Sequence, residues 1–251
     1  MSFYQLNKSD RQNLVDQINI HILTDIENKS NKKIIQYFSD EDTYIRKTAY
    51  LAIGKIYKSN EKLKKKILAE LNTLFNSDNE KIRQTVINAA GEIGIVDFPP
   101  IEHLMEQGLF DLHHSVRNAV IGSIKKMGEK NPKPVVAFAK KYLHHNDKEI
   151  RREICHGIEL RGRKHPQDIL PLLKELQNDK TARVRNTLVH VLGQIAYKKD
   201  CLEIVITDLK NWSNKELVAD ALEEIIDVHD RYKNFAVKTQ DEARNYIEQN
   251  F

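Results

Sequence analysis

Residues 45–56 read IRKTAYLAIGKI, an isoleucine and an arginine followed by a helical run of small and apolar residues. The Ile/Val-Arg pair that opens this run returns four more times. Its five arginines are Arg46, Arg83, Arg117, Arg151 and Arg185. The intervals between them are 37, 34, 34 and 34 residues. Self-similarity at such a period is typical of proteins built from stacked helical units. The interval therefore predicts a repeat architecture before any single motif is weighed.

Helical periodicity explains why the phrase repeats. Within residues 45–56, one stripe of a helix is formed by Ile45, Ala49, Ala52, Ile53 and Ile56. The same frame returns at residues 82–93 and 184–195. We expect the small residues Ala49 and Gly54 to let neighbouring helix axes approach closely.

The chain alternates between two kinds of helix, joined by short links that carry helix-end residues. We expect first helices at about residues 28–38, 60–75, 100–108, 134–144, 167–176 and 201–210. We expect second helices at about residues 43–58, 79–94, 115–128, 148–160, 182–197 and 215–229. The predicted fold class is all-α, an α-α superhelix or α-solenoid of about six helix pairs. Two local features are also expected. A capping box from Ser9 to Gln12 should start the first helix of the chain, and Pro171 should kink the fifth first helix.

The pattern resembles HEAT repeats, in which an acidic or amide residue stands a few positions before a Val/Ile-Arg pair. That feature is carried here by Asp78, Asn146-Asp147 and Asp179, and the resemblance covers about residues 38–229. It implies that the repeated arginines are structural and pair with acidic residues of the adjacent repeat. We expect one repeat domain over residues 1–251. Its parts would be an N-terminal cap helix at 1–27, repeats at 28–229 and a C-terminal cap at 230–251.

Composition narrows the function classes. The formal net charge of +4 argues only weakly for an anionic partner. No run approaches the ~20 apolar residues of a membrane span, and the N-terminus lacks the apolar stretch of a signal peptide. Cys155 and Cys201 form no Cys-x-x-Cys motif and fit a reducing compartment. We expect a cytoplasmic monomer.

Charge is unevenly placed along the chain. Residues 111–166 contain 13 Lys and Arg against 6 Asp and Glu, whereas residues 201–251 contain 6 against 11. The basic residues of interest, which the repeat does not require, are Arg152, Arg161, Arg163, Lys164, Lys125 and Lys126. They could form a positive stripe that contacts backbone phosphates or an acidic protein surface. Ordinary solvated helix faces account for them about as well. The leading hypothesis is a non-enzymatic binding module or scaffold that presents a basic concave surface to a protein or to duplex DNA.

The sequence gives little support for a metal site or for the common catalytic motifs. Eight of the ten histidines lie between His103 and His190, but no His-x-x-x-His spacing occurs. We therefore predict no metal site and no cofactor. Gly-rich phosphate loops and Gly-x-Ser-x-Gly motifs are also missing from the sequence.

One resemblance does reach a catalytic family. The stretches EIRREICHG (residues 149–157), ILPLL (169–173) and VRNTLV (184–189) resemble the bacterial HEAT-like alkylpurine DNA glycosylases. Trp212 falls near the place where some members carry a tryptophan. The resemblance covers about residues 110–212. It implies a basic concave groove for a lesioned duplex, with a carboxylate that stabilises the cationic sugar as the alkylated base departs.

The chain departs from that family at two positions. His156 and Gln194 stand where acidic residues are expected, and neutral side chains stabilise an oxocarbenium ion far less than a fixed carboxylate. Asp208 or Glu159 could substitute. The alternative hypothesis is therefore a DNA glycosylase that excises alkylated purines and would act in DNA alkylation repair.

Overall fold

The computed structural model describes residues 3–251, and the regular elements within that range are all helical. The chain forms two compact units, Met1–Asn131 (unit 1) and Pro132–Phe251 (unit 2). Both are built from antiparallel helix pairs, so the fold class is the α-solenoid of HEAT-like pairs that the repeat predicts. The expectation of one domain with terminal caps stays a prediction.

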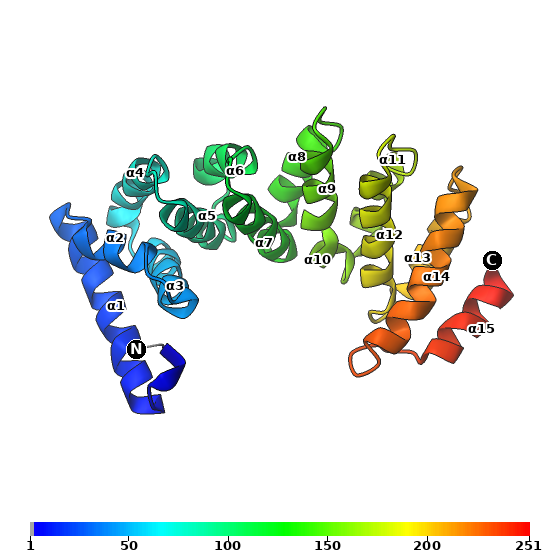
Figure 1. Cartoon of the computed structure of the whole chain (residues 1–251), viewed down its shortest axis with the longest axis horizontal. Helices are drawn as coiled ribbons and strands as arrows, with labels where there is room; N and C mark the ends of the chain where they lie inside the picture. The colour runs from blue at the N-terminus through cyan, green and yellow to red at the C-terminus, as the bar shows by residue number, and fades with distance from the viewer. Residues whose placement is uncertain (1–2) are drawn as a thin grey trace. The chain divides into compact units, whose positions relative to one another are not determined.

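Unit 1 contains α1 to α7 and three short 3-10 turns, Phe3–Gln5, Glu61–Leu63 and Pro99–Ile101, which precede α1, α4 and α6. The helices are α1 (Lys8–Asn28), α2 (Lys32–Phe38), α3 (Thr43–Ser59), α4 (Lys64–Phe75), α5 (Glu80–Gly94), α6 (Glu102–Leu109) and α7 (His114–Lys130). The second helices α3, α5 and α7 lie side by side, and α4 and α6 form a second row that lies above them in Figure 1. Gly54 permits a close approach here, because a Cβ at this position would overlap the side chain of Glu92 on α5.

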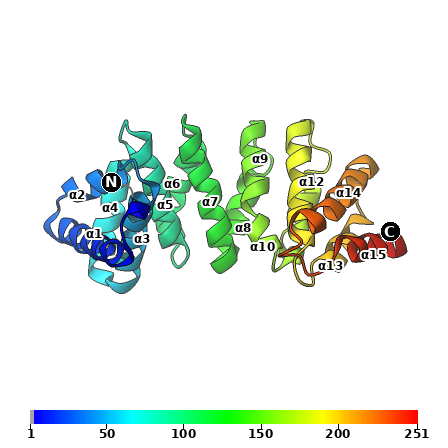
Figure 2. The ribbon, with the colours of Figure 1, turned by 60° about the horizontal axis from the view of Figure 1, so that its bottom comes forward.

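Unit 2 contains α8 to α15. These helices are α8 (Pro132–Tyr142), α9 (Lys148–Gly157), α10 (Glu159–Gly162), α11 (Leu170–Glu175), α12 (Ala182–Ala196), α13 (Leu202–Leu209), α14 (Lys215–Arg231) and α15 (Gln240–Asn250). The second helix α12 packs between α9 and α14, and α15 packs against α14 (Figure 2). Apolar residues one repeat apart, such as Ile154 and Leu188, are fully buried in these contacts.

All five repeated arginines make the same local contact. Each donates its Nη1 group to the backbone carbonyl six residues earlier, in the link that follows the first helix. The acceptors are the carbonyls of Asp40, Ser77, Asp111, His145 and Asp179. Carbonyls at helix ends lack intrahelical partners, and basic side chains commonly satisfy them. The arginine therefore ties each link to the second helix that follows it.

Two of these arginines also pair with the next repeat, as the HEAT resemblance implies. Arg151 donates from Nε and Nη2 to the two carboxylate oxygens of Asp179, at 2.5 and 2.9 Å, and both side chains are about 6% exposed. Arg83 binds Asp111 in the same two-pronged way within unit 1. Burial raises the pKa of each carboxyl, but the hydrogen bonds from arginine and from a nearby backbone amide outweigh it. The net pKa of Asp111 and of Asp179 lies below the ordinary value of 3.8.

Two local expectations are wrong. The first helix begins at Lys8, and its N-cap is Asn7, whose side chain accepts from the Asp10 amide. Ser9 therefore lies inside the helix instead of capping it, because Asn7 offers an equally good cap two residues earlier. Pro171 does not kink a continuous helix. It lies in the first turn of α11, after the 3-10 turn Pro166–Asp168, where a missing backbone donor costs nothing.

Both cysteines are buried without a disulfide. Burial raises the pKa of the Cys201 thiol to about 11 and also raises that of Cys155, so neither thiol ionises at neutral pH. They act as small apolar residues of unit 2, as the sequence suggests. Across residues 3–251, every helix is too short or too polar to span a membrane.

Candidate functional site

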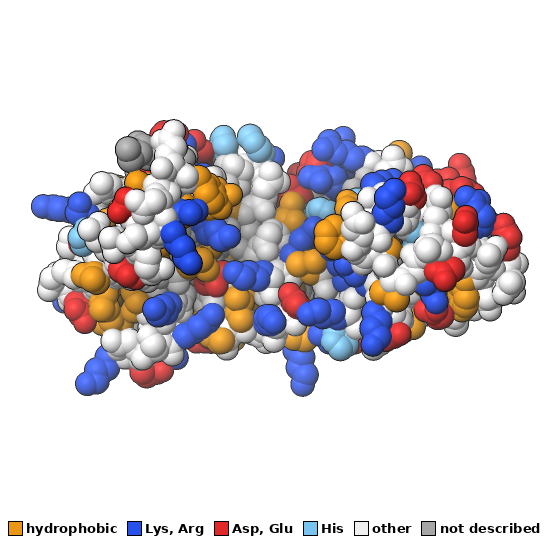
Figure 3. All heavy atoms as spheres, turned by 90° about the horizontal axis from the view of Figure 1, so that it is seen from below, with side chains coloured by type: hydrophobic (Ala, Val, Ile, Leu, Met, Phe, Trp, Pro, Cys, Tyr) orange, Lys and Arg blue, Asp and Glu red, His pale blue; other side chains and the backbone are white. Residues whose placement is uncertain are grey.

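The second helices of each unit provide an extended surface. In unit 2, α9, α12 and α14 are packed in sequence, so residues separated by one repeat occupy equivalent places on neighbouring helices. Arg152 on α9, Asn186 on α12 and Ala219 on α14 form one such row, because each stands five residues after the N-cap of its helix. On the face of unit 2 seen in Figure 3, Lys and Arg side chains lie among Asp and Glu, which gather toward the C-terminal end.

Arg152 on α9 is held by acidic neighbours. Its Nε donates to Glu149 Oε2 at 2.9 Å, and its Nη2 lies 3.6 Å from Glu153 Oε1. Glu153 is buried and Arg152 is half-buried. The guanidinium that the sequence proposes as an anion contact therefore already neutralises carboxylates of its own helix.

The two arginines at the end of α10, Arg161 in its last turn and Arg163 at its C-cap, behave in the same way. Arg161 donates from Nε and Nη2 to Asp168 Oδ2, at 2.8 and 2.5 Å, and so closes the loop before α11. Arg163 binds the buried carboxylate of Glu159, and its Nη2 also donates to Gln194 Oε1 on α12 at 2.6 Å. Gln194, which replaces an expected acid, thus joins two repeats by an amide.

The three lysines of the predicted basic set lie in different settings. Lys164 is exposed just after α10 in unit 2. Lys125 and Lys126 lie on α7 in unit 1, where Lys125 is half-buried and Lys126 pairs with Glu92 on α5. Four of the six predicted contact residues, Arg152, Arg161, Arg163 and Lys126, are therefore engaged in ion pairs within their own unit. Their role in partner binding stays a prediction.

The residues tied to the glycosylase resemblance are used for packing and pairing. Trp212 is about 1% exposed, and its Nε1 donates to Asp208 Oδ2 at 2.7 Å. A ring enclosed in this way offers no open face to a base. Glu159 is buried and bound by Arg163. Both carboxylates that could replace the missing acids thus have partners already.

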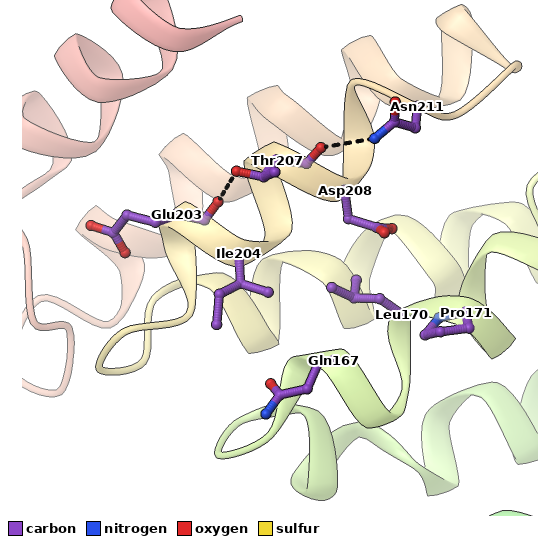
Figure 4. A pocket seen from close by; sticks show the side chains of 8 residues that line it. All are labelled: Gln167, Leu170, Pro171, Glu203, Ile204, Thr207, Asp208 and Asn211. Carbon is purple, nitrogen blue, oxygen red and sulfur yellow. Dashed lines mark hydrogen bonds between the residues drawn. The ribbon is translucent and has the colours of Figure 1, made fainter.

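A pocket opens on the first-helix side of unit 2, between α13 and the segment leading into α11 (Figure 4). It is lined by Gln167, Leu170, Pro171, Glu203, Ile204, Thr207, Asp208 and Asn211. Its polar groups are largely committed. Thr207 and Asn211 donate to backbone carbonyls of their own helix, and Glu203 pairs with Lys238 at 3.1 Å. Apolar side chains line much of the pocket, and most of its polar groups already have hydrogen-bond or ion-pair partners. The pocket therefore offers few polar groups that could bind or activate a ligand.

The structure also brings together three side chains that the sequence analysis left apart. One potential ligand atom from each of His156, Glu159 and His190 lies within 4.8 Å of the others. Two signals could have indicated this group. His156 and His190 are one 34-residue interval apart, and acidic residues stand three positions before and after His156, at Glu153 and Glu159. The His-x-x-x-His spacing describes two histidines on one helix, whereas His156 and His190 meet across two repeats.

The sequence of the chain matches the family described as Cnd1, the non-SMC mitotic condensation complex subunit 1, over residues 11–161. That match spans more than half of the chain. The chain belongs to the Cnd1 family. The matched region includes all of the described second helices of unit 1 and extends through α9 and most of α10 in unit 2. It contains Arg152 and His156 but ends before Arg163 and His190. Comparison with the curated proteins finds no match.

Solved helical-repeat structures resemble this Cnd1-family chain at low identity. A chain from a structure of Kap95p and RanGDP is 15% identical, with a TM-score of 0.47 over 79% of this chain and 30% of that one. A computationally designed armadillo repeat protein for peptide recognition is 16% identical, with a TM-score of 0.35 and coverages of 78% and 98%. A chain from the CpcE–CpcF complex of phycocyanin lyase of Nostoc is 12% identical, with a TM-score of 0.34 and coverages of 88% and 95%. This chain thus spans under a third of the first of them, and nothing about its partners follows from these likenesses.

Proposed function

We propose that the chain is a non-enzymatic scaffold that binds a protein partner across the second-helix faces of its repeats. One observation carries the proposal. Second helices pack side by side within each unit, so side chains one repeat apart, such as Arg152 and Asn186, share one extended surface. Helical repeats use such surfaces to hold partners over many weak contacts. The family description as a subunit of a complex agrees with this role.

The ion pairs favour a protein over the phosphate backbone of duplex DNA. Phosphate binding draws its affinity from cations that are free to replace the counterions of the duplex. Arg152, Arg161 and Arg163 would have to leave Glu149, Asp168 and Glu159 to do so. A surface of both signs suits a protein partner with complementary charges, which sets the register of binding. We further expect the chain to be a monomer. It would bind this partner in a reducing compartment such as the cytoplasm.

Site-specific photo-cross-linking tests the proposed face. A photoreactive residue would replace Asn186 on α12 or Ala219 on α14, two exposed positions that each stand five residues after the N-cap of their helix. The controls replace Lys140 on α8 and Thr207 on α13, which are exposed on first helices. We expect the same protein, identified by mass spectrometry, to be captured at both second-helix positions and at neither control. Capture at the first-helix positions alone, or equal capture at all four, would contradict the proposed face.

Duplex binding decides between the two partner classes. We expect fluorescence anisotropy to show only weak, non-specific affinity, with a Kd in the range of about 10⁻⁴ to 10⁻⁶ M at physiological salt. The double variant Arg161→Glu/Arg163→Glu should then behave like the control Lys140→Glu. A loss of about 10³ in affinity between 50 and 200 mM salt, with a further loss specific to the double variant, would instead establish a phosphate-binding stripe.

The glycosylase alternative has a direct assay. Alkylated duplex DNA is incubated with the chain, and free alkylated purine is measured in the supernatant. We expect none above the spontaneous rate, because Trp212 is enclosed and Glu159 and Asp208 have partners. Release that depends on Glu159 or Asp208 would establish the enzyme and overturn the scaffold.

A further inference from the structure

His156, Glu159 and His190 come from three helices of unit 2, α9, α10 and α12. His156 lies in the last turn of α9, Glu159 begins α10 and His190 lies in the middle of α12. The Glu159 side chain is 2% exposed, whereas those of His156 and His190 are 29% and 41% exposed. The group therefore has a buried carboxylate at its base and two imidazoles at its rim, open to solvent on one side.

The repeat itself explains why the two imidazoles meet. The interval from His156 to His190 is 34 residues, the same as the interval from Arg151 to Arg185. The two histidines thus hold equivalent positions on α9 and α12, which pack against each other. Their ring centroids are 5.7 Å apart. The pairing is a consequence of the stacking and does not require a special loop.

Distances within the group suit a shared ion. His156 Nδ1 lies 3.0 Å from Glu159 Oε2, and the widest separation among the three candidate ligand atoms is within 4.8 Å. Two ligand atoms bound tetrahedrally at ~2.0–2.1 Å from one ion lie ~3.3 Å apart. The His156–Glu159 pair already meets this spacing. A shift of at most about 1.5 Å in the partly exposed His190 side chain would complete it.

Charged residues next to the three candidate ligands contact Glu159 and His190. Arg163 binds Oε1 of Glu159 and leaves Oε2 directed at His156. On the other side, His190 Nδ1 lies 3.6 Å from Glu224 Oε1, a residue one further repeat along on α14. Carboxylates behind a ligating histidine, and hydrogen bonds to a ligating carboxylate, are the usual outer partners of metal sites. The Arg163 charge lowers the affinity for a cation, so we expect moderate binding.

We propose that His156, Glu159 and His190 bind one divalent first-row transition-metal ion, with Zn²⁺ as the preferred ion. Two imidazoles and one carboxylate form a ligand set typical of Zn²⁺ sites with three protein ligands, which leave a further position open. The ion would join α9 and α10 to α12 and stiffen unit 2 at this point. Its open position would accept water or a donor atom from another molecule. The proposal is independent of the scaffold function, because its test needs no partner.

Isothermal titration of the full-length chain, prepared without a histidine tag, tests this site with Zn²⁺. We expect one ion per chain and a rise in Tm on adding Zn²⁺. His156→Ala and His190→Ala should each lower the affinity by about 100-fold or more, beyond the 10- to 100-fold typical of outer partners. The matched control is His144→Ala. His144 also pairs with a glutamate, Glu175, at 2.6 Å, but no third ligand accompanies them in any group found within the described residues. It should leave Zn²⁺ binding unchanged.

Co²⁺ supplies a second readout. Replacing Zn²⁺ by Co²⁺ should give d–d absorption without a thiolate charge-transfer band, since both cysteines are buried and neither belongs to the group of three ligands. Circular dichroism confirms that each variant is folded before titration. The proposal is overturned if the wild-type chain binds no Zn²⁺, if both histidine variants keep its affinity, if His144→Ala weakens binding equally, or if a thiolate band shows that the ion lies elsewhere.

Discussion

Arg151 and Asp179 show how a single repeated residue stabilises two levels of structure. Arg151 satisfies link carbonyls of its own repeat through Nη1 and binds the carboxylate of the next repeat through Nε and Nη2. Asp179 in turn accepts from the Thr181 amide at the start of α12. Each buried polar atom in this group thus has a partner, which is the condition under which burial of charge is tolerated.

Removing the charge of Asp179 should therefore be costly. Asp179→Asn leaves the Arg151 guanidinium about 6% exposed without its counter-charge, and breaking a buried pair in this way costs about 3–5 kcal/mol. The control is Glu203→Gln, which removes a surface pair with Lys238 at 36% and 41% exposure and should cost under about 1 kcal/mol. Urea unfolding measures both. Equal effects would show that the buried pair adds nothing beyond a surface pair.

The effect of Asp179→Asn should also depend on pH. The carboxyl has a lower pKa in the folded chain than its ordinary value of 3.8, so its contribution to stability is complete above pH 3.8. That contribution is lost as the pH falls through the lower folded pKa. The difference in unfolding free energy between the wild type and Asp179→Asn should therefore shrink below pH 3.8. A difference that grew with acidification would contradict this assignment.

At the scale of elements, glycines set the distance between second helices. A Cβ at Gly91 on α5 would lie 2.7 Å from the Ser123 Cβ on α7 and closer still to its hydroxyl oxygen. Ser123 donates that hydroxyl to the Ile87 carbonyl of α5 at 3.3 Å. Helix contacts this close tolerate no larger side chain without a shift of the neighbour. The small residues of the repeated phrase are thus spacing residues.

A pair of glycine substitutions tests this role. Gly91→Ala should destabilise the chain by about 1–3 kcal/mol, because the methyl group overpacks the contact with Ser123. Gly122→Ala on α7 is the matched control, since a Cβ there meets open space within 4 Å. It should stabilise the chain by about 0.5–1 kcal/mol through helix propensity. Thermal or urea unfolding distinguishes the two, and a destabilising Gly122→Ala would argue against the spacing explanation.

At the scale of the whole molecule, stability is expected to be distributed along the stack. In repeat proteins each repeat contacts only the repeats next to it, so a defect destabilises the nearby helices first. The packing of α12 against α9 and α14 in unit 2, and of α5 against α3 and α7 in unit 1, follows this rule. A local lesion should therefore produce a local response.

Hydrogen exchange measured by mass spectrometry can show whether a substitution destabilises only the neighbouring helices. In Asp179→Asn, amides of α9 and α12 should exchange faster than in the wild type, whereas those of α3 and α5 in unit 1 should keep their protection. The reason is that the Arg151–Asp179 pair joins only the repeats on either side of it. Faster exchange spread evenly over the whole chain would instead indicate one cooperative folding unit.

Much of the architecture could be predicted from the order of residues. The 34-residue interval, the apolar stripe and the arginine after each Ile or Val together predicted the helix pairs and the structural use of Arg83 and Arg151. These features are local or strictly periodic. The sequence of a single repeat specifies which residues form its apolar stripe, and this stripe packs against the adjacent repeat. At the first cap, the sequence pattern predicted Ser9, whereas the folded chain uses Asn7.

The sequence pattern could not predict which partners the charged and polar side chains would have. A count of Lys and Arg suggested a basic surface, but only the packed chain shows that Arg161 folds back on Asp168 and that Arg163 reaches Gln194 31 positions away. The meeting of His156 with Glu159 and His190 is of the same kind. Periodicity specifies which residues share a face, because hydrophobic burial follows the helical repeat. Charge pairing and ligand convergence depend on rotamers and helix-to-helix distances of a few ångströms, which exist only once the helices are packed.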